Sequence, residues 1–469
     1  MVRRLDGRRT DLRFDHDPGI PYRPPALESH KIKTKLAGTA LATAGVGKHS
    51  ADMSQLLRSD LFRFLTGTAL LAIATLTRIP APTDLLWKIS IAATEGGHWL
   101  ALSALFPAVP RVGQGLLGRV GGYCSLAATV LFVMPLFQAY QFNGDLPSKL
   151  QATFGAERRE RGRYSEGVRQ EPFIVGDVVS STPLQPIRIE ERVFSTLEGE
   201  KLTLDVFKPA YEHTALPGVL VIHGGSWQGG SSREFLPLNA YLASRDFVVF
   251  SINYRLAPKW KFPAGRDDVL SAIAYLKVYA KELGLDPTRL VLLGRSSGGQ
   301  LALLAAYTAN DSAIRGVISV YGPTDLRYGY ENPPRKQLID TRGVLETYLG
   351  GSPSSAEEAY FTASPINFVT PASPPTLLIH GSNDRHVSPE ESARLDAKLT
   401  QAAVKHVFVR LPWATHGCDW SFKGPCGQVT TYAIEHFLER VVKTAAPTAK
   451  DHHERLAQNR GADSKRAKH

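Results

Sequence analysis

The sequence predicts an α/β fold in which a mostly parallel central sheet is flanked by helices. An apolar, helical region precedes this part of the chain. Two observations support the prediction. Three long apolar stretches occupy residues 61–143. Further along, short apolar runs that suit buried strands recur, with a helical pattern at 268–283 between two of them. These runs lie at 219–222, 247–253, 290–293, 316–321, 376–379 and 407–411.

The length of the chain indicates more than one domain. It has 469 residues, of which 43% are hydrophobic, so it can bury a sizeable core. We predict five parts, in order: a disordered basic arm (1–60), an apolar helical membrane region (61–143), a linker (144–179), an α/β domain (180–443) with an insertion at about 327–373, and a disordered basic tail (444–469).

The formal net charge of +11 is concentrated in the arms and linkers. In the first sixty residues, acids such as Asp6 and Asp11 are interleaved with the basic residues. This mixture favours membrane-adjacent loops over a nucleic-acid groove. We therefore predict a membrane partner and no nucleic-acid partner.

The apolar stretches differ in how well each could cross a bilayer. Stretch 120–144 contains no charged side chain and is long enough for a hydrocarbon core of about 30 Å. Stretch 64–77 is short, and stretch 89–110 carries Glu95 and His98 on one predicted helical face. The alternative is a helical cap packed on the α/β part. The apolar region starts too late in the chain for a signal peptide.

The membrane topology follows from the basic residues that flank these stretches. Arg111 and Arg119 favour a cytoplasmic second loop, and three crossings would then place the α/β domain outside the cytoplasm. Lys149, Arg158 and Arg159 oppose this arrangement, and two crossings would leave the domain in the cytoplasm. We predict a membrane protein with an extracytoplasmic α/β domain.

The α/β part begins with two predicted antiparallel edge strands over 188–207, joined near Gly199. The buried strand 219–222 follows, and 247–253 is the next. The connection between Leu326 and Pro374 is long for a sheet protein. Such a long connection usually forms a lid or a wall of the substrate site.

The most informative motif is the turn around Ser296. Gly294, Ser296 and Gly298 form a G-x-S-x-G pattern between the apolar run 290–293 and a helical pattern. A strand–turn–helix of this kind holds the serine hydroxyl exposed above the sheet. We predict that Ser296 is a nucleophile, which then needs a base, an orienting acid and oxyanion donors.

The loop after strand 219–222 is a candidate oxyanion loop. It contains His223, Gly224, Gly225 and Ser226, and glycines after a strand let backbone N–H groups face a bound carbonyl. We predict that the N–H groups of Gly225, Ser226 and Ser297 are the donors. His223 and Gly224 are expected to support the loop, and Trp227 is expected to line the substrate pocket.

The acid and the base are predicted to lie after two later strands. Asp384 follows strand 376–379 and His416 follows strand 407–411, which gives the order serine, acid, histidine along the chain. Asp384 could instead cap the next helix, and His416 could be an ordinary loop residue. His386 is a rival base, and His380 is most simply a packing residue.

Together these signatures resemble the esterase/lipase branch of the α/β-hydrolase superfamily, which includes the hormone-sensitive-lipase-like enzymes. The resemblance covers about 180–443. One departure is Ser226, which stands where the family frequently has a third glycine. The signatures that support the resemblance are His223–Gly225, 254–258, 262–264, Asp268, the turn around Ser296, and 321–325.

The resemblance implies that carboxylic esters are cleaved through an acyl-enzyme, with no metal and no organic cofactor. Small-molecule or lipid esters are the expected substrates. Cleavage of amides or peptides by the same triad is the main alternative, and an acyltransferase is also compatible. A catalytically inactive binding module on a membrane anchor is a further alternative.

Three cysteines occur in the chain. Cys124 lies in the third apolar stretch, whereas Cys418 and Cys426 bracket the loop after His416. The latter two could form a bridge in an oxidising compartment, or both could be free thiols.

Overall fold

The computed structural model describes residues 59–110, 112, 114–155, 168–180, 184–197, 199–211, 215–334 and 338–442. The predicted disordered arm and tail lie almost entirely outside these residues, as do Arg158, Arg159 and Arg111.

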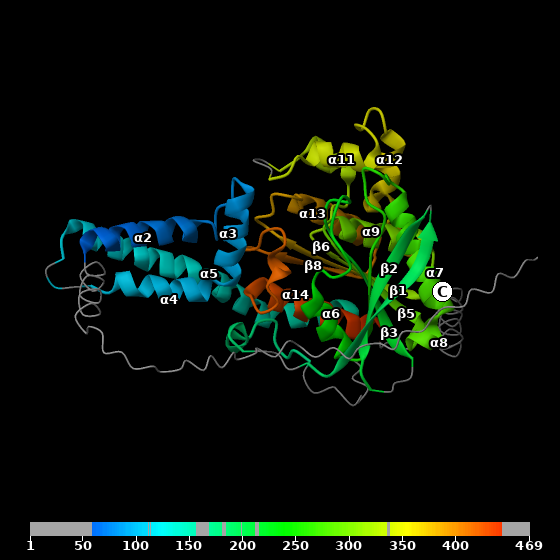
Figure 1. Cartoon of the computed structure of the whole chain (residues 1–469), viewed down its shortest axis with the longest axis horizontal. Coiled ribbons are helices and arrows are strands. Elements are labelled where there is room, and N and C mark those ends of the chain that lie inside the picture. The colour runs from blue at the N-terminus through cyan, green and yellow to red at the C-terminus, as the bar shows by residue number, and fades with distance from the viewer. Residues whose placement is uncertain are drawn as a thin grey trace, which may run out of the picture.

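An eight-stranded sheet forms the centre of the α/β part, in the order β1-β2-β4-β3-β5-β6-β7-β8 (Figure 1). β1 and β2 form an antiparallel hairpin, and β2 pairs antiparallel with β4. All pairings from β4 to β8 are parallel, as the sequence predicts. The strands are β1 Ile187–Leu197, β2 Glu200–Pro209, β3 Leu216–Ile222, β4 Val248–Ile252, β5 Leu285–Arg295, β6 Ile314–Val320, β7 Thr376–Gly381 and β8 His406–Leu411.

Helices cover both faces of the sheet because alternate strand residues point to opposite sides. In β3, Val219 and Val221 join one buried cluster, whereas Leu220 and Ile222 join the other. The helix predicted at 268–283 begins earlier and is broken at Tyr279. The helices are α6 Leu236–Ala243, α7 Ala264–Val278, α8 Ala280–Leu283, α9 Ser297–Thr308, α13 Pro389–Gln401 and α14 Pro425–Val442.

The long connection between β6 and β7 is helical. It contains α10 Leu326–Glu331, α11 Thr341–Leu349, α12 Glu357–Ala363 and the short 3-10 helix η2 Pro365–Phe368. In Figure 1, α11 and α12 lie above the sheet, at its upper edge. Leu326 and Leu345 of this insertion line the cavity that contains Ser296.

The N-terminal region forms four helices: α2 Asp60–Thr75, α3 Asp84–Glu95, α4 Gly97–Ala108 and α5 Leu116–Phe154. The second apolar stretch, expected to be one helix, is divided at Gly96 into α3 and α4. Glu95 and His98 are therefore not on one helical face. Of the described helices, only α5 is long and apolar enough to cross a membrane.

The prediction of a linker at 144–179 is wrong for its first part, 144–154, which belongs to α5. α5 continues through Pro135 and Pro147 to Phe154. Leu146, Leu150 and Phe154 recur every four residues, and they are buried in the same cluster as the sheet. The predicted apolar stretch ended at residue 144 because charged residues reappear there. One face of the helix nevertheless stays apolar for about three more turns, and this face packs α5 against the catalytic domain.

Helices α2, α4 and α5 pack into a bundle that projects from the α/β part (Figure 1). Gly115 N–H donates to Asp60 (2.6 Å), and Thr77 at the other end reaches the Leu131 carbonyl (3.4 Å), so α2 and α5 run parallel. The Arg63 guanidinium donates to the Pro107 carbonyl at 2.5 Å. The end of α4 thus lies beside the start of α2, and α4 is antiparallel to both.

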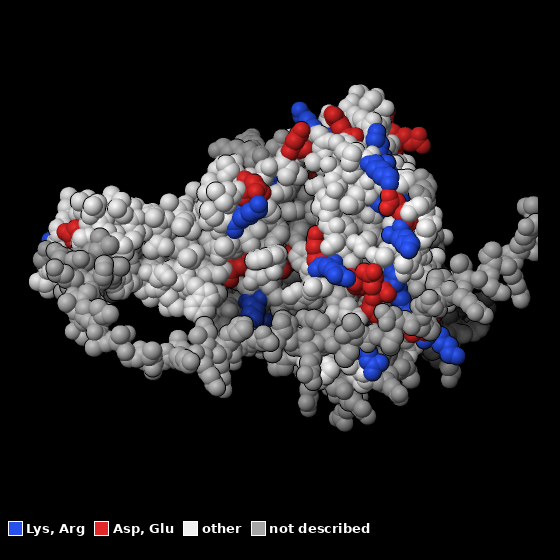
Figure 2. All heavy atoms as spheres, viewed as in Figure 1, with Lys and Arg blue, Asp and Glu red and all other residues white. Residues whose placement is uncertain are grey.

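The surface of this bundle is largely apolar. Its visible face in Figure 2 carries few charged side chains. Exposed apolar side chains occur on all three helices, among them Leu65, Leu102, Phe106, Leu126 and Phe137. Contiguous exposed apolar surface of this kind marks an interaction with a membrane or a partner.

Two glycines let α2 and α5 approach at backbone distance. A Cβ on Gly121 would overlap the carbonyl of Arg63, and a Cβ on Gly67 would overlap the carbonyl of Gly121. Small residues at a helix crossing are typical of helix packing within membranes.

Gly121→Ala should therefore destabilise the protein, by about 1–3 kcal/mol, because the added methyl forces the helices apart. Gly144→Ala is the matched control on the same helix, since its Cβ would meet nothing within 4 Å. That control should be neutral or stabilising by about 0.5–1 kcal/mol. Thermal unfolding of the full chain in detergent measures both, and equal effects would contradict this packing.

Candidate active site

The side chains predicted as nucleophile, base and acid meet at the carboxyl ends of three neighbouring strands. Ser296 lies between β5 and α9, Asp384 follows β7, and His416 follows β8. His416 Nε2 is 3.0 Å from Ser296 Oγ, and His416 Nδ1 is 2.6 Å from Asp384 Oδ2. The imidazole thus connects the hydroxyl to the carboxylate.

The backbone at Ser296 adopts a conformation that L-residues rarely take, with φ 52° and ψ −125°. The close approach of strand and helix explains the glycines around it. A Cβ on Gly294 would overlap the carbonyl of Gly298, and one on Gly298 would overlap the carbonyls of Ile222 and His223. Only glycine fits at these two positions, so the serine is held at a sharp turn.

Asp384 is buried and accepts several hydrogen bonds. Its Oδ1 accepts from the backbone N–H groups of His386 (2.8 Å) and Val387 (3.0 Å). Burial opposes ionisation, but interactions with His416 and His380 outweigh it and keep the pKa of Asp384 well below its usual value. The helix-cap alternative does not hold, because Ser388 caps α13.

Neither of the other two histidines near Asp384 has a hydrogen bond to Ser296. The His386 ring stacks on the His416 ring, with centroids 4.8 Å apart. Burial, together with the neighbouring His416, lowers the pKa of His386 to about 4, so it is neutral at neutral pH. His380 Nδ1 lies 2.7 Å from the Ser392 hydroxyl, and its Nε2 lies 3.2 Å from Asp384.

The glycine loop after β3 lies beside Ser296. Gly225 (φ 109°), Ser226 (φ 56°) and Trp227 (φ 58°) all have left-handed backbones. The N–H groups of Gly225 and Ser226 donate to no other group in the described chain. The N–H of Ser297 opens α9, where backbone donors have no intrahelical partner. These three donors are therefore available to a ligand.

His223 and Gly224 are the first two residues of this loop. His223 Nδ1 is 2.7 Å from the Gly224 carbonyl oxygen, and its ring stacks on Tyr254 at 4.3 Å. Burial lowers the pKa of His223 to about 4. A neutral, stacked histidine with a hydrogen bond to the backbone fixes the loop conformation.

A small, mostly apolar cavity of about 50 Å³ opens at Ser296. Trp227, the residue that the sequence analysis assigned to the substrate pocket, forms part of the wall of this cavity. Its ring stacks on Tyr348 at 4.2 Å, and its Nε1 donates to Gln300 (2.9 Å). The other lining residues are Ser226, Ser297, Pro323, Leu326, Gly329, Ile339, Thr341, Val344, Leu345, His386, Val387, Glu391 and His416.

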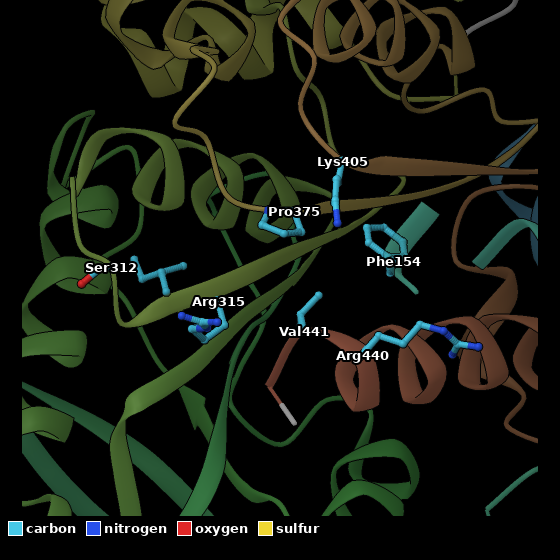
Figure 3. Close-up of a pocket in the computed structure, with 8 residues that line it drawn as sticks. Phe154, Ser312, Arg315, Pro375, Lys405, Arg440 and Val441 are labelled. Carbon is cyan, nitrogen blue, oxygen red and sulfur yellow. The ribbon is translucent and has the colours of Figure 1, made fainter. Parts of the chain in front are cut away.

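A larger cavity, of about 290 Å³, lies at the opposite end of the strands (Figure 3). Ile314 and Arg315 at the start of β6, and Lys405 just before β8, contribute to its lining. Ligands of parallel sheets bind at the carboxyl ends of the strands, so this cavity is not the reaction site. Among the described residues, no group of three His, Cys, Asp or Glu side chains could hold a metal ion.

A buried ion pair beneath the site was not predicted from the sequence. Arg295, directly before Ser296, donates from Nε to Asp419 at 2.6 Å, and both side chains are buried. Tyr321 donates to the other oxygen of Asp419 at 2.5 Å. A charged residue inside the serine motif is a sequence signal that an acidic partner is needed, but it does not locate that partner.

Glu391 is a second residue that sequence reasoning missed. It is buried at the cavity wall, and its Oε2 accepts from the backbone N–H groups of Thr324 (2.8 Å) and Asp325 (3.2 Å). Burial raises the pKa of Glu391 to about 8.

The structure also joins Cys418 and Cys426 in a disulfide, which is one of the two states that the sequence left open. Cys124 is a free thiol on α5.

The parallel sheet with a serine turn after its fifth strand defines the chain as an α/β-hydrolase. A family model described as BD-FAE matches residues 204–399. Ethyl acetate hydrolase of Pseudomonas putida is 37% identical over 244 residues, which cover 50% of this chain and 76% of that protein. The chain therefore belongs to the esterase/lipase branch of this superfamily, whose members are carboxylic ester hydrolases.

Two further relatives are each similar to about half of the chain. Esterase LipC of Mycobacterium tuberculosis is 32% identical over 254 residues, which cover 50% of this chain and 61% of LipC. The match thus spans less than two thirds of LipC's length. The solved structure of a Pyrobaculum calidifontis esterase is 26% identical, with a TM-score of 0.48 over 54% of this chain and 86% of that one.

Glu391→Gln should change how stability depends on pH. An unfolded glutamate ionises near pH 4.3, whereas folded Glu391 keeps its proton until about pH 8. Between these values the unfolded state loses a proton that the folded state retains, so wild-type stability falls as pH rises. Glutamine removes this loss, which is on the order of 3 kcal/mol by pH 7.

Unfolding measured from pH 5 to pH 8 checks this expectation: the variant should gain on the wild type as pH rises. Glu390→Gln, the exposed neighbour on α13, is the control and should follow the wild type. A constant difference between Glu391→Gln and the wild type would show that Glu391 is ionised in the folded protein.

Proposed function

We propose that this protein hydrolyses carboxylic esters through an acyl-enzyme, with Ser296, His416 and Asp384 as the catalytic triad. Ser296 Oγ attacks the ester carbonyl while His416 Nε2 takes the hydroxyl proton. The imidazolium returns this proton to the departing alcohol, which leaves Ser296 acylated. Water then attacks the acyl group with His416 again acting as base, and the acid is released.

The observation that carries the proposal is the continuous chain of hydrogen bonds from Ser296 to Asp384. Its distances of 3.0 and 2.6 Å are those that proton transfer requires. The buried carboxylate of Asp384, which is ionised because of its low pKa, would hold His416 Nδ1 protonated and stabilise the imidazolium.

Oxyanion stabilisation is assigned to the N–H groups of Gly225, Ser226 and Ser297. Two of these donors are on the glycine loop and the third is at the start of α9, so they approach from two sides of Ser296. Each donor of this type typically contributes about 3–4 kcal/mol to the transition state.

The proposed substrates are small-molecule esters or esters of lipids from the membrane. Leu326, Val344 and Leu345 give the cavity its apolar wall, and the stacked Trp227–Tyr348 pair closes one side. A free volume of about 50 Å³ suits a short acyl group.

Ser296→Ala should lower turnover by about 10⁴–10⁶-fold while the protein stays folded, because the nucleophile is lost and the oxyanion donors remain. Hydrolysis of p-nitrophenyl acetate and labelling by a fluorophosphonate measure the effect. Ser382→Ala is the control, since that hydroxyl contacts Arg410 rather than the triad. Near-wild-type hydrolysis by Ser296→Ala would refute the assignment.

A substrate panel distinguishes the proposed activity from the alternatives that share the triad. p-Nitrophenyl esters from acetate to palmitate should be cleaved fastest at short chain length. Faster cleavage of matched arylamides would indicate an amidase or peptidase. Transfer of the acyl group to an added alcohol instead of water would indicate an acyltransferase. Failure of the fluorophosphonate to label would indicate an inactive binding module.

We also propose that the bundle of α2, α4 and α5 anchors the protein in a membrane. From Leu116 to Gln138, α5 extends about 33 Å, close to the hydrocarbon thickness of about 30 Å. Helix α4 has 12 residues, or about 18 Å, and runs antiparallel to α2 and α5 within the bundle, so it returns the chain to the end where α5 begins. The apolar outer surface of the bundle supports contact with lipid.

The direction of the helices predicts which parts of the chain lie on opposite sides of this membrane. Because α2 and α5 run parallel and the second half of α5 packs in the core of the sheet, both helices start at the bundle end away from the catalytic domain (Figure 1). If the bundle spans the bilayer, residue 59 and the catalytic domain are on opposite sides. The Cys418–Cys426 disulfide favours an oxidising, extracytoplasmic location for the catalytic domain.

Protease treatment of right-side-out vesicles tests the topology. With tags at the two chain termini, we expect external protease to remove the C-terminal tag and to spare the N-terminal one. Resistance of the protein to carbonate extraction is the accompanying test of anchoring. Protection of both tags would place the catalytic domain in the cytoplasm.

A further inference from the structure

Helix α3 belongs to the N-terminal region in sequence, but it contacts the active site. In Figure 1 it stands between the bundle and the α/β part. Trp87, Ile91 and Glu95 recur every four residues and therefore form one stripe on the helix. This stripe faces the segment 416–426, the histidine loop, which begins with the catalytic base and ends at the start of α14.

Trp87 contacts the beginning of the histidine loop. Its Nε1 donates to the carbonyl oxygen of His416 at 3.0 Å. Its ring also lies 4.5 Å from the His386 ring, which in turn stacks on the imidazole of His416. Trp87 thus restrains His416 both through its backbone and through the ring beside it.

Glu95 contacts the end of the same loop, two turns further along α3. Its Oε2 accepts from the backbone N–H of Cys426 at 3.0 Å, and the side chain is buried. A Cβ on Gly424 would overlap the Glu95 carboxylate, so the backbone of the loop lies directly against it. Ile91 fills the space between, near Gly417.

The histidine loop is also restrained internally and from the sheet side. The Cys418–Cys426 disulfide closes the loop, and the buried Arg295–Asp419 ion pair ties it to the residue before the nucleophile. α3 covers the remaining side and contacts both ends. None of these α3 residues lines the cavity at Ser296.

We propose that α3 is a positioning element of the active site: Trp87 and Glu95 hold the two ends of the histidine loop and thereby set the place of the His416 imidazole relative to Ser296. The N-terminal region therefore contributes to the chemical step as well as to anchoring. This inference rests on the proposed role of His416 as the base.

The test compares full-length variants in detergent by their kcat and KM for p-nitrophenyl acetate. Rates are normalised to the sites that a fluorophosphonate labels at completion. Trp87→Ala should lower kcat by about 10–100-fold, because small displacements of a catalytic group are costly. Trp87→Phe keeps a ring against His386 but loses the N–H donor, and should lower kcat by about threefold to tenfold. KM should stay within about twofold of wild type in both.

Glu95 provides a matched pair of substitutions. Glu95→Gln keeps an oxygen that accepts from Cys426, so its kcat should stay within about twofold of wild type, whereas Glu95→Ala should lower kcat by about threefold or more. Trp99→Ala is the control for tryptophan loss: Trp99 is exposed on α4 and should leave kcat unchanged.

The outcomes separate this inference from the proposed function. If Trp87→Ala and Glu95→Ala both keep the wild-type kcat per labelled site, α3 only supports the fold and the inference is overturned. This holds even if their melting temperatures are lower. If Trp87→Ala does not fold, Trp87→Phe decides by the same criterion. An active Ser296→Ala variant would instead overturn the proposed function itself.

Discussion

The strained turn at Ser296 is the constraint on which the rest of the site depends. A positive φ at a serine is unfavourable by itself, and it persists because β5, β3 and α9 approach at backbone distance around Gly294 and Gly298. This packing places the hydroxyl at the carboxyl edge of the sheet. The loops that follow β3, β7 and β8 begin at the same edge, so the fold itself brings the proposed oxyanion donors, acid and base together there.

Polar groups buried at this edge fix the two loops that carry the acid and the base. Asp384 is held by backbone donors and by two histidines, and the histidine loop by a disulfide, by the Arg295–Asp419 pair and by α3. A buried arginine without a carboxylate would be costly, so Arg295 and Asp419 restrain each other as much as they restrain the loop. The proposed base thus belongs to a rigid network, as catalytic groups require.

Helix α5 connects the apolar bundle to the catalytic domain without a hinge. Its first half packs against α2 through glycines, whereas Leu146, Leu150 and Phe154 in its second half join the core beneath the sheet. Phe142 also meets the Trp413 ring, which precedes the base by three residues. With α3 against the histidine loop, the N-terminal region and the catalytic domain share two interfaces. The α3 interface lies beside His416, whereas the α5 interface extends to Phe154, which lines the cavity at the opposite end of the strands.

The sequence by itself predicted the α/β fold and the candidate residues Ser296, Asp384 and His416 in their order along the chain. It could do so because each of these residues follows a short apolar strand in a recognisable local motif. It also left the Cys418–Cys426 pairing open and placed a linker where α5 continues. Only the tertiary structure brought Trp87 to His416 across 329 positions and Arg295 to Asp419 across 124. Local periodicity decides which residues form a strand, a turn or a helix, whereas the partner of a buried side chain depends on how distant elements pack, and no local pattern records that choice.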